Sequence, residues 1–334
     1  RLPAPWHLLA AILTTRGLSH GEKIKAIRFG RYALTHTLSK DADISVLALL
    51  HRQAQSPDLI RKLWEPLCIA ALNTPMDIAS ARIFIRVLKN TFADSRQHSD
   101  LLIPRRELSD LLPRPGLAYL EDHGAKIELG QRVTSITADA GRVTGVHVGD
   151  RHIDASRVVL ATPPVISRRL VARHSVLNPL GLQLAELGSE PVATLYLQYP
   201  TETKIDFPIS GLQSSLGHWV FDRRICGQPG LMAVVISARG DHDTLTGEEL
   251  TARVVNELAA CFPHWPAPEH TRLIREKRAT FCSRVGVDAV RPDNRTAVQG
   301  LWLAGDYTNT GLPATLESAV RSGTACARAL LDQP

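Results

Sequence analysis

The segment from residue 301 to residue 323 constrains the fold of this chain more than any other. Leu301–Ala304 is an apolar run that predicts a buried strand, Gly305 and Asp306 form a turn after it, and a loop then leads to a helix rich in small residues. A helix N-terminus offers free N–H groups and a partial positive charge, which suit an anionic ligand. The carboxylate of Asp306 can accept hydrogen bonds from sugar hydroxyls, although Asp after Gly is also common in ordinary turns. The segment therefore predicts a strand–turn–helix unit that holds a nucleotide cofactor.

Two stretches of this chain resemble a known family. Residues 304–319, Ala-Gly-Asp-Tyr-Thr-Asn-Thr-Gly-Leu-Pro-Ala-Thr-Leu-Glu-Ser-Ala, resemble the C-terminal flavin motif of the amine oxidase and phytoene desaturase superfamily. This form is most similar to one branch, the squalene-associated FAD-dependent enzymes called hydroxysqualene dehydroxylases. Residues 64–75, Trp-Glu-Pro-Leu-Cys-Ile-Ala-Ala-Leu-Asn-Thr-Pro, resemble a signature of the same branch. The resemblance implies an FAD cofactor and covers nearly the whole chain.

The resemblance also implies where the cofactor binds. The glycine of the turn would let FAD approach the backbone closely, and the aspartate would bind its ribityl or ribose-side hydroxyls. The first residues of the last helix would lie near the pyrimidine end of the flavin, where an acidic side chain would equally favour the helix dipole. A residue at the start of a strand in the middle of the chain would contact the adenine. The implied cofactor-binding residues are Val133, Gly305, Asp306, Thr315, Leu316 and Glu317.

The family reaction removes a hydroxyl from hydroxysqualene and yields squalene, with reduced FAD as the reductant. Such a step needs a general acid at the oxygen, a hydride at the carbon and a long, dry, apolar tunnel. Glu65 is the candidate acid because it neighbours an apolar stripe, where burial would raise its pKa, although it also fits a solvated helix position. Asn73 is a candidate to bind the hydroxyl, or it caps the end of the helix.

A glycine-rich Gly-x-Gly-x-x-Gly turn, which would cradle the FAD pyrophosphate, is absent from this sequence. In the resembled family this turn stands at the extreme N-terminus, so we expect the chain to be an N-terminally truncated piece. The expected fold class is α/β, with an incomplete Rossmann-like FAD-binding domain interleaved with an α+β substrate domain. The resemblance assigns residues 1–112 and 166–296 to the substrate domain, and residues 113–165 and 297–334 to the remnant of the FAD-binding domain.

Periodicity gives a coarse map of the elements. Residues 1–110 predict helices, among them Gly21–Leu38 capped by Ser19, and Pro66 is expected to kink or shorten a helix. Beyond this region the pattern changes to a period of two, and Ala125–Leu129 is expected to be the first of several strands.

Composition excludes several function classes. The formal charge of +6 is spread over scattered Lys and Arg residues, which argues against a nucleic-acid partner and leaves weak attraction to anionic membranes open. Five unpatterned cysteines fit free thiols in a reducing cytoplasm, with peripheral contact to the inner membrane left open. No His/Cys cluster predicts a metal site, and no apolar run approaches the ~20 residues of a membrane-spanning helix.

Three hypotheses follow. The first is an FAD-dependent dehydroxylase that acts on a C30 isoprenoid lipid and draws electrons from NAD(P)H or another donor. The second is a carotenoid desaturase or amine oxidase of the same superfamily; an aromatic content of 5% argues mildly against the amine oxidase, which needs an aromatic cage. The third is a module that binds lipid or a protein partner without flavin, which the missing glycine-rich turn supports.

Overall fold

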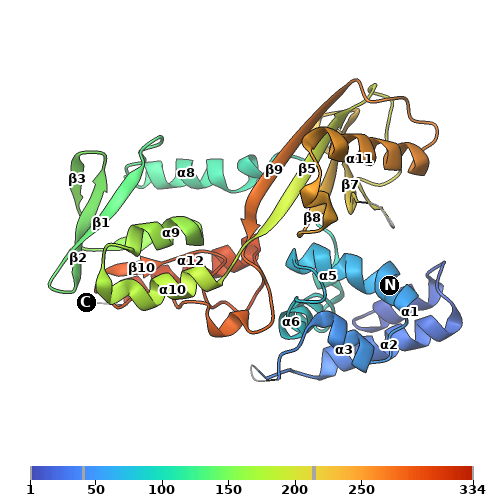
Figure 1. Ribbon diagram of the computed structural model, residues 1–334, viewed down its shortest axis with the longest axis horizontal. Helices are drawn as coiled ribbons and strands as arrows, with labels where there is room; N and C mark the ends of the chain where they lie inside the picture. The colour runs from blue at the N-terminus through green and yellow to red at the C-terminus, as the bar shows by residue number, and fades with distance from the viewer. Residues whose placement is uncertain (1, 40–41, 213–215, 333–334) are drawn as a thin grey trace.

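The computed structural model describes residues 2–39, 42–212 and 216–332, and it contains three units (Figure 1). The first is a group of helices at the N-terminal end. The second is a five-stranded antiparallel sheet with one long helix, and the third combines helices with a three-stranded meander and a parallel strand pair. The predicted α/β fold class is confirmed.

The helical unit is stabilised by caps and by an apolar core. Ser19 caps α2 as predicted: its side chain accepts a hydrogen bond from the Glu22 N–H, and the Glu22 carboxylate accepts one from the Ser19 N–H. Phe29 is fully buried and meets Trp64 edge to face. The elements are α1 (Trp6–Thr14), α2 (His20–Thr35), α3 (Val46–Arg52), α4 (Pro57–Leu59), the π-helical η1 (Ile60–Trp64), α5 (Glu65–Leu72), α6 (Ala81–Phe92) and η2 (Arg96–Ser99).

Helical structure continues past Pro66, and the change in its regular pattern lies just before this residue. The chain remains helical from α4 through η1 to α5, and Pro66 lies in the first turn of α5. The five residues before α5 form a wider π-helical turn, in which the usual i to i−4 hydrogen-bond pattern already changes. A proline, which lacks an N–H, is tolerated directly after such a turn.

The five-stranded sheet has the strand order β6-β7-β8-β5-β9, and all its neighbours are antiparallel. β5 alternates buried and half-buried side chains, and α11 packs Leu250, Val254 and Leu258 against the sheet. The edge strand β9 is exposed and rich in charge, which protects it from pairing with other chains. The elements are β5 (Glu190–Gln198), β6 (Ile209–Gly211), β7 (Trp219–Asp222), η4 (Arg223–Cys226), β8 (Leu231–Ser237), η5 (Asp241–Thr244), α11 (Gly247–Cys261) and β9 (His270–Thr280). The short helix η6 (Val287–Ala289) follows β9, and its Val287 joins the larger core of the other two units.

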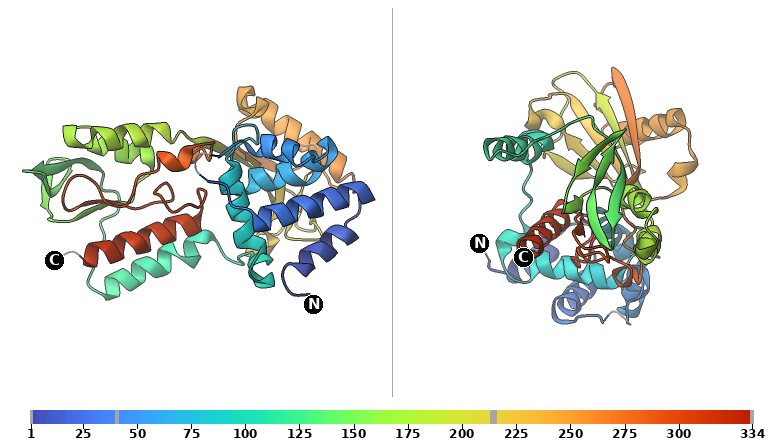
Figure 2. Two further views of the ribbon diagram at one scale, coloured as in Figure 1. Left: turned by 90° about the horizontal axis from the view of Figure 1, so that it is seen from below. Right: turned by 90° about the vertical axis from the view of Figure 1, so that its left-hand side faces the viewer.

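In the third unit, two segments far apart in the sequence pair as parallel strands, β4 and β10. Trp302 of β10 packs with Cys326 of α12, whereas Leu301 and Leu303 join the larger core that includes Leu170 of α9. Figure 2 (left) shows α12 on one side of this region and the α9–α10 pair on the other. β10 is therefore buried on both faces, as parallel strands are. The elements are α7 (Leu108–Leu111), α8 (Pro113–Asp122), β1 (Val133–Asp139), β2 (Arg142–Val148), β3 (Arg151–Asp154), β4 (Val158–Leu160), α9 (Pro164–Val171), η3 (Ser175–Leu177), α10 (Asn178–Glu186), β10 (Leu301–Leu303) and α12 (Leu316–Leu331).

One predicted strand is wrong. Ala125–Leu129 is irregular, and the meander β1-β2-β3 begins only at Val133. The segment follows α8, which has no buried residue, and no strand of the described chain pairs with it. An alternating pattern forms a strand only where a partner strand satisfies its backbone groups. The pairing of β4 with β10 joins the two ranges assigned to the FAD-binding domain, whose boundaries stay a prediction.

Candidate functional site

The turn after β10 requires glycine at its first position. Gly305 has φ +154°, and a Cβ built there would lie 2.6 Å from a ring carbon of Tyr307. Its N–H donates a hydrogen bond to Ser322 Oγ in α12 at 3.0 Å. The turn is thus drawn against the helix that follows it, and the Tyr307 ring fills the space that a side chain at position 305 would need.

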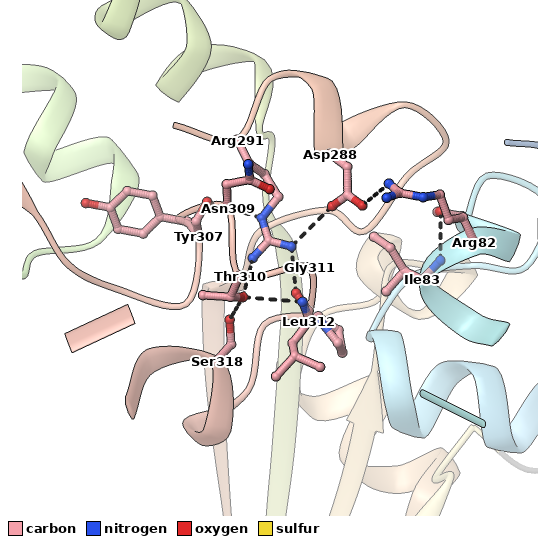
Figure 3. Close-up of polar contacts among 12 residues, drawn as sticks. Arg82, Ile83, Asp288, Arg291, Tyr307, Asn309, Thr310, Gly311, Leu312 and Ser318 are labelled. Atoms are coloured by element: carbon pink, nitrogen blue, oxygen red, sulfur yellow. Dashed lines mark hydrogen bonds and ion pairs between the residues drawn. The ribbon is translucent and has the colours of Figure 1, made fainter. Parts of the chain in front are cut away.

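The loop between β10 and α12 is organised around one buried arginine (Figure 3). The Arg291 side chain has no exposed area, and its guanidinium donates hydrogen bonds to the carbonyl oxygens of Asp306 (2.9 Å), Leu312 (2.7 Å) and Thr308. It also donates to Thr310 Oγ1 at 3.0 Å. A planar guanidinium can satisfy several carbonyls at once, so a single side chain fixes the path of the whole loop.

Asp288 connects this loop to the helical unit. Its buried carboxylate pairs with Arg291 at 3.3 Å and with Arg82 (Figure 3), and also with Arg86 at 3.6 Å. Arg82 and Arg86 come from α6. Arg86 also donates to the carbonyl of Gly311, where an added Cβ would lie 2.5 Å from Nη1. Burial lowers the pKa of Arg291, and the Asp288 charge opposes that shift. Three guanidinium groups share one carboxylate, so the loop carries a cationic excess that suits an anionic ligand.

Asp306 lies on a cleft of about 660 Å³. The cleft is lined by the turn residues 305–307, by residues 161–166 after β4 and by residues 278–281 at the end of β9. Three segments that are distant in the sequence therefore meet where β4 and β10 end. Ligands of α/β proteins bind at the carboxyl ends of parallel strands, and the volume is within the usual range for such sites.

The electrostatics of Asp306 fit a ligand with hydroxyl groups. Burial raises the pKa of its carboxyl above the ordinary value, and the charge of Arg291 partly opposes this shift. Burial also raises the pKa of the neighbouring Tyr307 to about 12, and the phenol shares a 3.1 Å hydrogen bond with Ser167 Oγ. A carboxylate that has lost water is stabilised by hydrogen-bond donors, which the hydroxyls of a cofactor would supply. The carboxylate of Asp306, at the edge of this cleft, thus fits the hydroxyls of an FAD sugar or ribityl chain.

The start of α12 has a structural explanation of its own. Thr315 is the N-cap, with Oγ1 accepting from the Ser318 N–H at 3.2 Å. Leu316 is 69% exposed, and Glu317 forms a 2.6 Å ion pair with Arg321 on the helix surface. None of the three lines the cleft that contains Asp306. Their contacts with the flavin stay predictions.

Val133 is the first residue of β1, lies opposite Val148 in β2 and is 37% exposed. It belongs to the same unit as Asp306 but does not line the cleft. The predicted adenine contact of Val133 therefore also stays a prediction.

Glu65 lies at the start of α5 and lines a different cavity, of about 400 Å³. Ile69 and Met76 face this cavity together with Asp77, His218, Arg239 and His242, so its wall is mixed apolar and polar. Burial lowers the pKa of His218, and the neighbouring His242 adds to the effect, which favours a neutral imidazole. Glu65 lines a cavity of mixed polarity, and its catalytic role stays a prediction.

Asn73 ends α5 in the left-handed conformation and is buried. Its amide nitrogen donates to Thr280 Oγ1 at 2.9 Å and to the Pro191 carbonyl at 3.3 Å, while its oxygen accepts from the Ala238 N–H at 2.6 Å. Asn73 therefore ties α5 to three segments of the five-stranded sheet. These bonds engage both ends of the amide, and contact with a substrate hydroxyl stays a prediction.

Sequence reasoning did not find Arg291, Asp288 or Arg86. Asp288 and Arg291 have the i, i+3 spacing of an ion pair, but Arg86 is more than two hundred positions away in the sequence. A charged residue three positions from an opposite charge is common at protein surfaces. Only burial distinguishes this pair, and burial becomes visible only in the tertiary structure.

Comparison with protein families decides the placement of the chain. The family model described as flavin containing amine oxidoreductase matches residues 1–331. The chain belongs to this family. The predicted superfamily is therefore confirmed, as is its character as a family of flavin-dependent oxidoreductases that use FAD.

The curated relatives share less than a third of their residues with this chain. The hydroxysqualene dehydroxylase of Sinorhizobium fredii is 29% identical over 82% of this chain and 63% of its own length. The hydroxysqualene dehydroxylase of Zymomonas mobilis is 25% identical over 93% of this chain and 74% of its own length. The 15-cis-phytoene desaturase of Solanum lycopersicum is 22% identical over 74% of this chain and 45% of its own length. The chain spans about 63% of the length of the first two curated relatives it matches.

Solved structures support the fold. An oxidoreductase from Methanosarcina mazei superposes with a TM-score of 0.75 at 15% identity, covering 93% of this chain and 73% of its own. A putrescine oxidase bound to putrescine superposes with a TM-score of 0.67 at 16% identity, covering 96% of this chain and 77% of its own. At such identities the likeness concerns the fold alone. Within the described residues, no group of three His, Cys, Asp or Glu side chains could hold a metal ion.

Proposed function

We propose that this chain forms part of an FAD-dependent enzyme that reductively removes the hydroxyl of hydroxysqualene and yields squalene. The observation that carries the proposal is the turn at Gly305 and Asp306, which opens on the 660 Å³ cleft and is held from behind by Arg291. The similarity to hydroxysqualene dehydroxylases over 82% and 93% of the chain supports this substrate class.

In the proposed reaction a C–O bond breaks, a C–H bond forms, and the oxygen leaves as water after it takes up a proton. Bound reduced FAD supplies the hydride and is itself oxidised. Asp306 binds cofactor hydroxyls, and Arg82, Arg86 and Arg291 supply the cationic field. Glu65 is the proposed proton donor to the leaving oxygen; it lines the cavity of about 400 Å³, so this role requires the reacting carbon to lie between that cavity and the Asp306 cleft.

The test is reconstitution followed by turnover. Purified protein is mixed with FAD, freed of excess cofactor and examined for a flavin absorption spectrum. Hydroxysqualene and a chemical reductant of flavin are then added without oxygen, and the products are separated by gas chromatography. We expect squalene to appear in proportion to bound flavin. Retained flavin without squalene would refute the dehydroxylase, and failure to retain flavin would refute a flavin role for this chain.

The role of Glu65 has its own test. Glu65→Gln keeps the size of the side chain but cannot donate a proton, so we expect turnover to fall about 100-fold or more with flavin binding unchanged. Glu248→Gln, in the first turn of α11, is the matched control and should retain activity. Equal activity of the two variants would exclude Glu65 as the acid.

A carotenoid desaturase is the second candidate, since such enzymes are also among the relatives, including a probable zeta-carotene desaturase of Synechococcus elongatus that is 24% identical over 98% of this chain. It would oxidise its substrate and reduce the flavin. Incubation of oxidised holoprotein with phytoene or zeta-carotene would bleach the flavin spectrum in that case, whereas the dehydroxylase leaves it unchanged.

A further inference from the structure

We propose that α1 and α2 form a docking surface for an anionic lipid bilayer. The proposal concerns a part of the molecule remote in sequence from the flavin loop, and it does not depend on the reaction proposed above. The α1–α2 surface, as we define it, consists of the exposed apolar residues Leu2, Trp6, Leu13 and Ile24 and the exposed basic residues Arg16, Lys25, Arg28 and Arg31.

Helix α1 is apolar but has no buried residue. Its sequence Trp-His-Leu-Leu-Ala-Ala-Ile-Leu-Thr contains only two polar side chains. Trp6 is 59% exposed and Leu13 is 52% exposed. A helix of a globular protein normally buries its apolar face against the core. Figure 2 (left) shows α1 outside α2 at the edge of the molecule, which leaves one side of α1 without a covering element.

The two helices enclose an apolar groove of about 270 Å³. Trp6, Leu9 and Ile12 of α1 form one wall, and Ile27 and Leu34 of α2 form the other. Except for Arg31 and Thr35, the side chains that line it are apolar, so the groove offers no specific hydrogen-bond pattern to a polar ligand. Its chemistry matches a hydrocarbon chain.

Basic side chains surround this apolar area. The opposite face of α2, with Phe29 in its centre, is buried, so the orientation of the helix is fixed. Ile24, Arg28 and Arg31 recur at helical spacing on the outer face. The single acidic residue among positions 2–39, Glu22, is engaged in the capping box with Ser19. An apolar helix beside basic side chains is the arrangement by which peripheral proteins bind anionic membranes.

A second segment extends the apolar area. His7 Nε2 and Ser99 Oγ share a 3.0 Å hydrogen bond, which holds the end of η2 beside α1. Leu101 and Leu102 follow within three residues of Ser99 and are 79% and 93% exposed. No helix of the described chain is long and apolar enough to cross a bilayer, so the contact would be interfacial.

The test is co-sedimentation of the whole chain with lipid vesicles. We expect binding to vesicles of phosphatidylcholine with phosphatidylglycerol, weaker binding to phosphatidylcholine alone, and release by salt. Arg28→Gln with Arg31→Gln should weaken binding about tenfold or more on anionic vesicles. Trp6→Ser with Leu13→Ser should weaken binding to both kinds of vesicle. All four side chains are exposed, so the fold should survive, which circular dichroism checks.

The matched control changes an exposed basic residue and an exposed aromatic residue outside the α1–α2 surface. Lys204→Gln with Phe207→Ser, on the loop between β5 and β6, should leave vesicle binding unchanged, although Phe207 is 74% exposed. Binding that the control lowers as much as the surface variants would overturn the proposal. So would absence of vesicle binding, or self-association of the chain in light scattering that Trp6→Ser with Leu13→Ser abolishes.

Discussion

The loop after β10 and the α1–α2 surface use opposite means to present a binding surface. The loop is polar and is held from behind by Arg291, whose side chain is wholly buried. The α1–α2 surface is apolar, has exposed side chains, and α1 buries none of its residues. A small ligand with fixed hydroxyl groups needs atoms held in place, whereas a fluid lipid surface needs only apolar area and charge. Substitutions should therefore lower the free energy of unfolding strongly in the loop and hardly at all on the α1–α2 surface.

The largest effect is expected from Arg291→Met. It removes the hydrogen bonds to the carbonyls of Asp306, Tyr307, Thr308 and Leu312 and leaves Asp288 short of its most buried partner, so we expect the free energy of unfolding to fall by about 3–5 kcal/mol. Urea denaturation measures the change. Arg295→Met is the control four residues away, since this exposed arginine only stacks on Trp302 and should cost at most about 1 kcal/mol. Equal losses would refute the central role of Arg291.

Gly305→Ala should have the next largest effect. The alanine would be strained at φ +154° and would meet the Tyr307 ring, which costs about 2–3 kcal/mol. We also expect weaker flavin retention, because displacement of the Tyr307 ring would disturb the turn that carries Asp306. Gly323→Ala in α12 has free space around it and should instead stabilise the helix by about 0.5–1 kcal/mol. Thermal unfolding with and without FAD distinguishes the two.

Asp306→Asn tests the cofactor contact with little change in shape. Loss of charge-assisted hydrogen bonds should raise the dissociation constant for FAD about tenfold, which corresponds to about 1.4 kcal/mol. Fluorescence titration measures it. Asp154→Asn, at a side chain that is 97% exposed, is the control and should bind FAD as the parent does.

The raised pKa of Asp306 predicts that the stability of the flavin-free protein depends on pH, and Asp306→Asn tests this. Burial places the pKa of folded Asp306 above its ordinary value of 3.8, so the folded state holds this proton more tightly. The stability that the protonated group contributes is complete below pH 3.8 and is lost as the pH rises through the folded pKa. Asp306→Asn should therefore be relatively more stable than the parent at neutral pH, and this advantage should shrink on acidification. If the difference in unfolding free energy between Asp306→Asn and the parent stayed constant from acidic to neutral pH, the raised pKa of Asp306 would be contradicted.

The smallest effect is expected on the α1–α2 surface. Leu13→Ser should change the free energy of unfolding by less than about 1 kcal/mol, because the side chain is half exposed. Phe29→Ala, on the buried face of α2, is the contrasting control and should cost about 3–5 kcal/mol. A large loss for Leu13→Ser would show that α1 is covered in solution, contrary to the docking proposal.

Local patterns determined the elements whose causes lie within a few residues. The strand–turn–helix after Leu301, the cap at Ser19 and the turn carrying Asp306 follow from apolar runs, capping residues and glycine. Ala125–Leu129 shows the limit of such patterns, since alternation predicted a strand and no partner strand is present in the described chain. A strand depends on its neighbour, which local sequence does not specify.

The tertiary structure alone decided what holds the site. Arg86 reaches Asp288 and Gly311 across more than two hundred positions, and Asn73 uses its amide to join α5 to distant parts of the sheet. In the sequence Arg86 looks like any other polar residue of a helix, and Asn73 is a candidate for a different role, as a hydroxyl contact or helix cap. They differ because folding removes them from water beside particular partners, and both burial and partner are properties of the packed chain. The sequence thus specified the turn that carries Asp306, and packing between distant segments specified the support behind it.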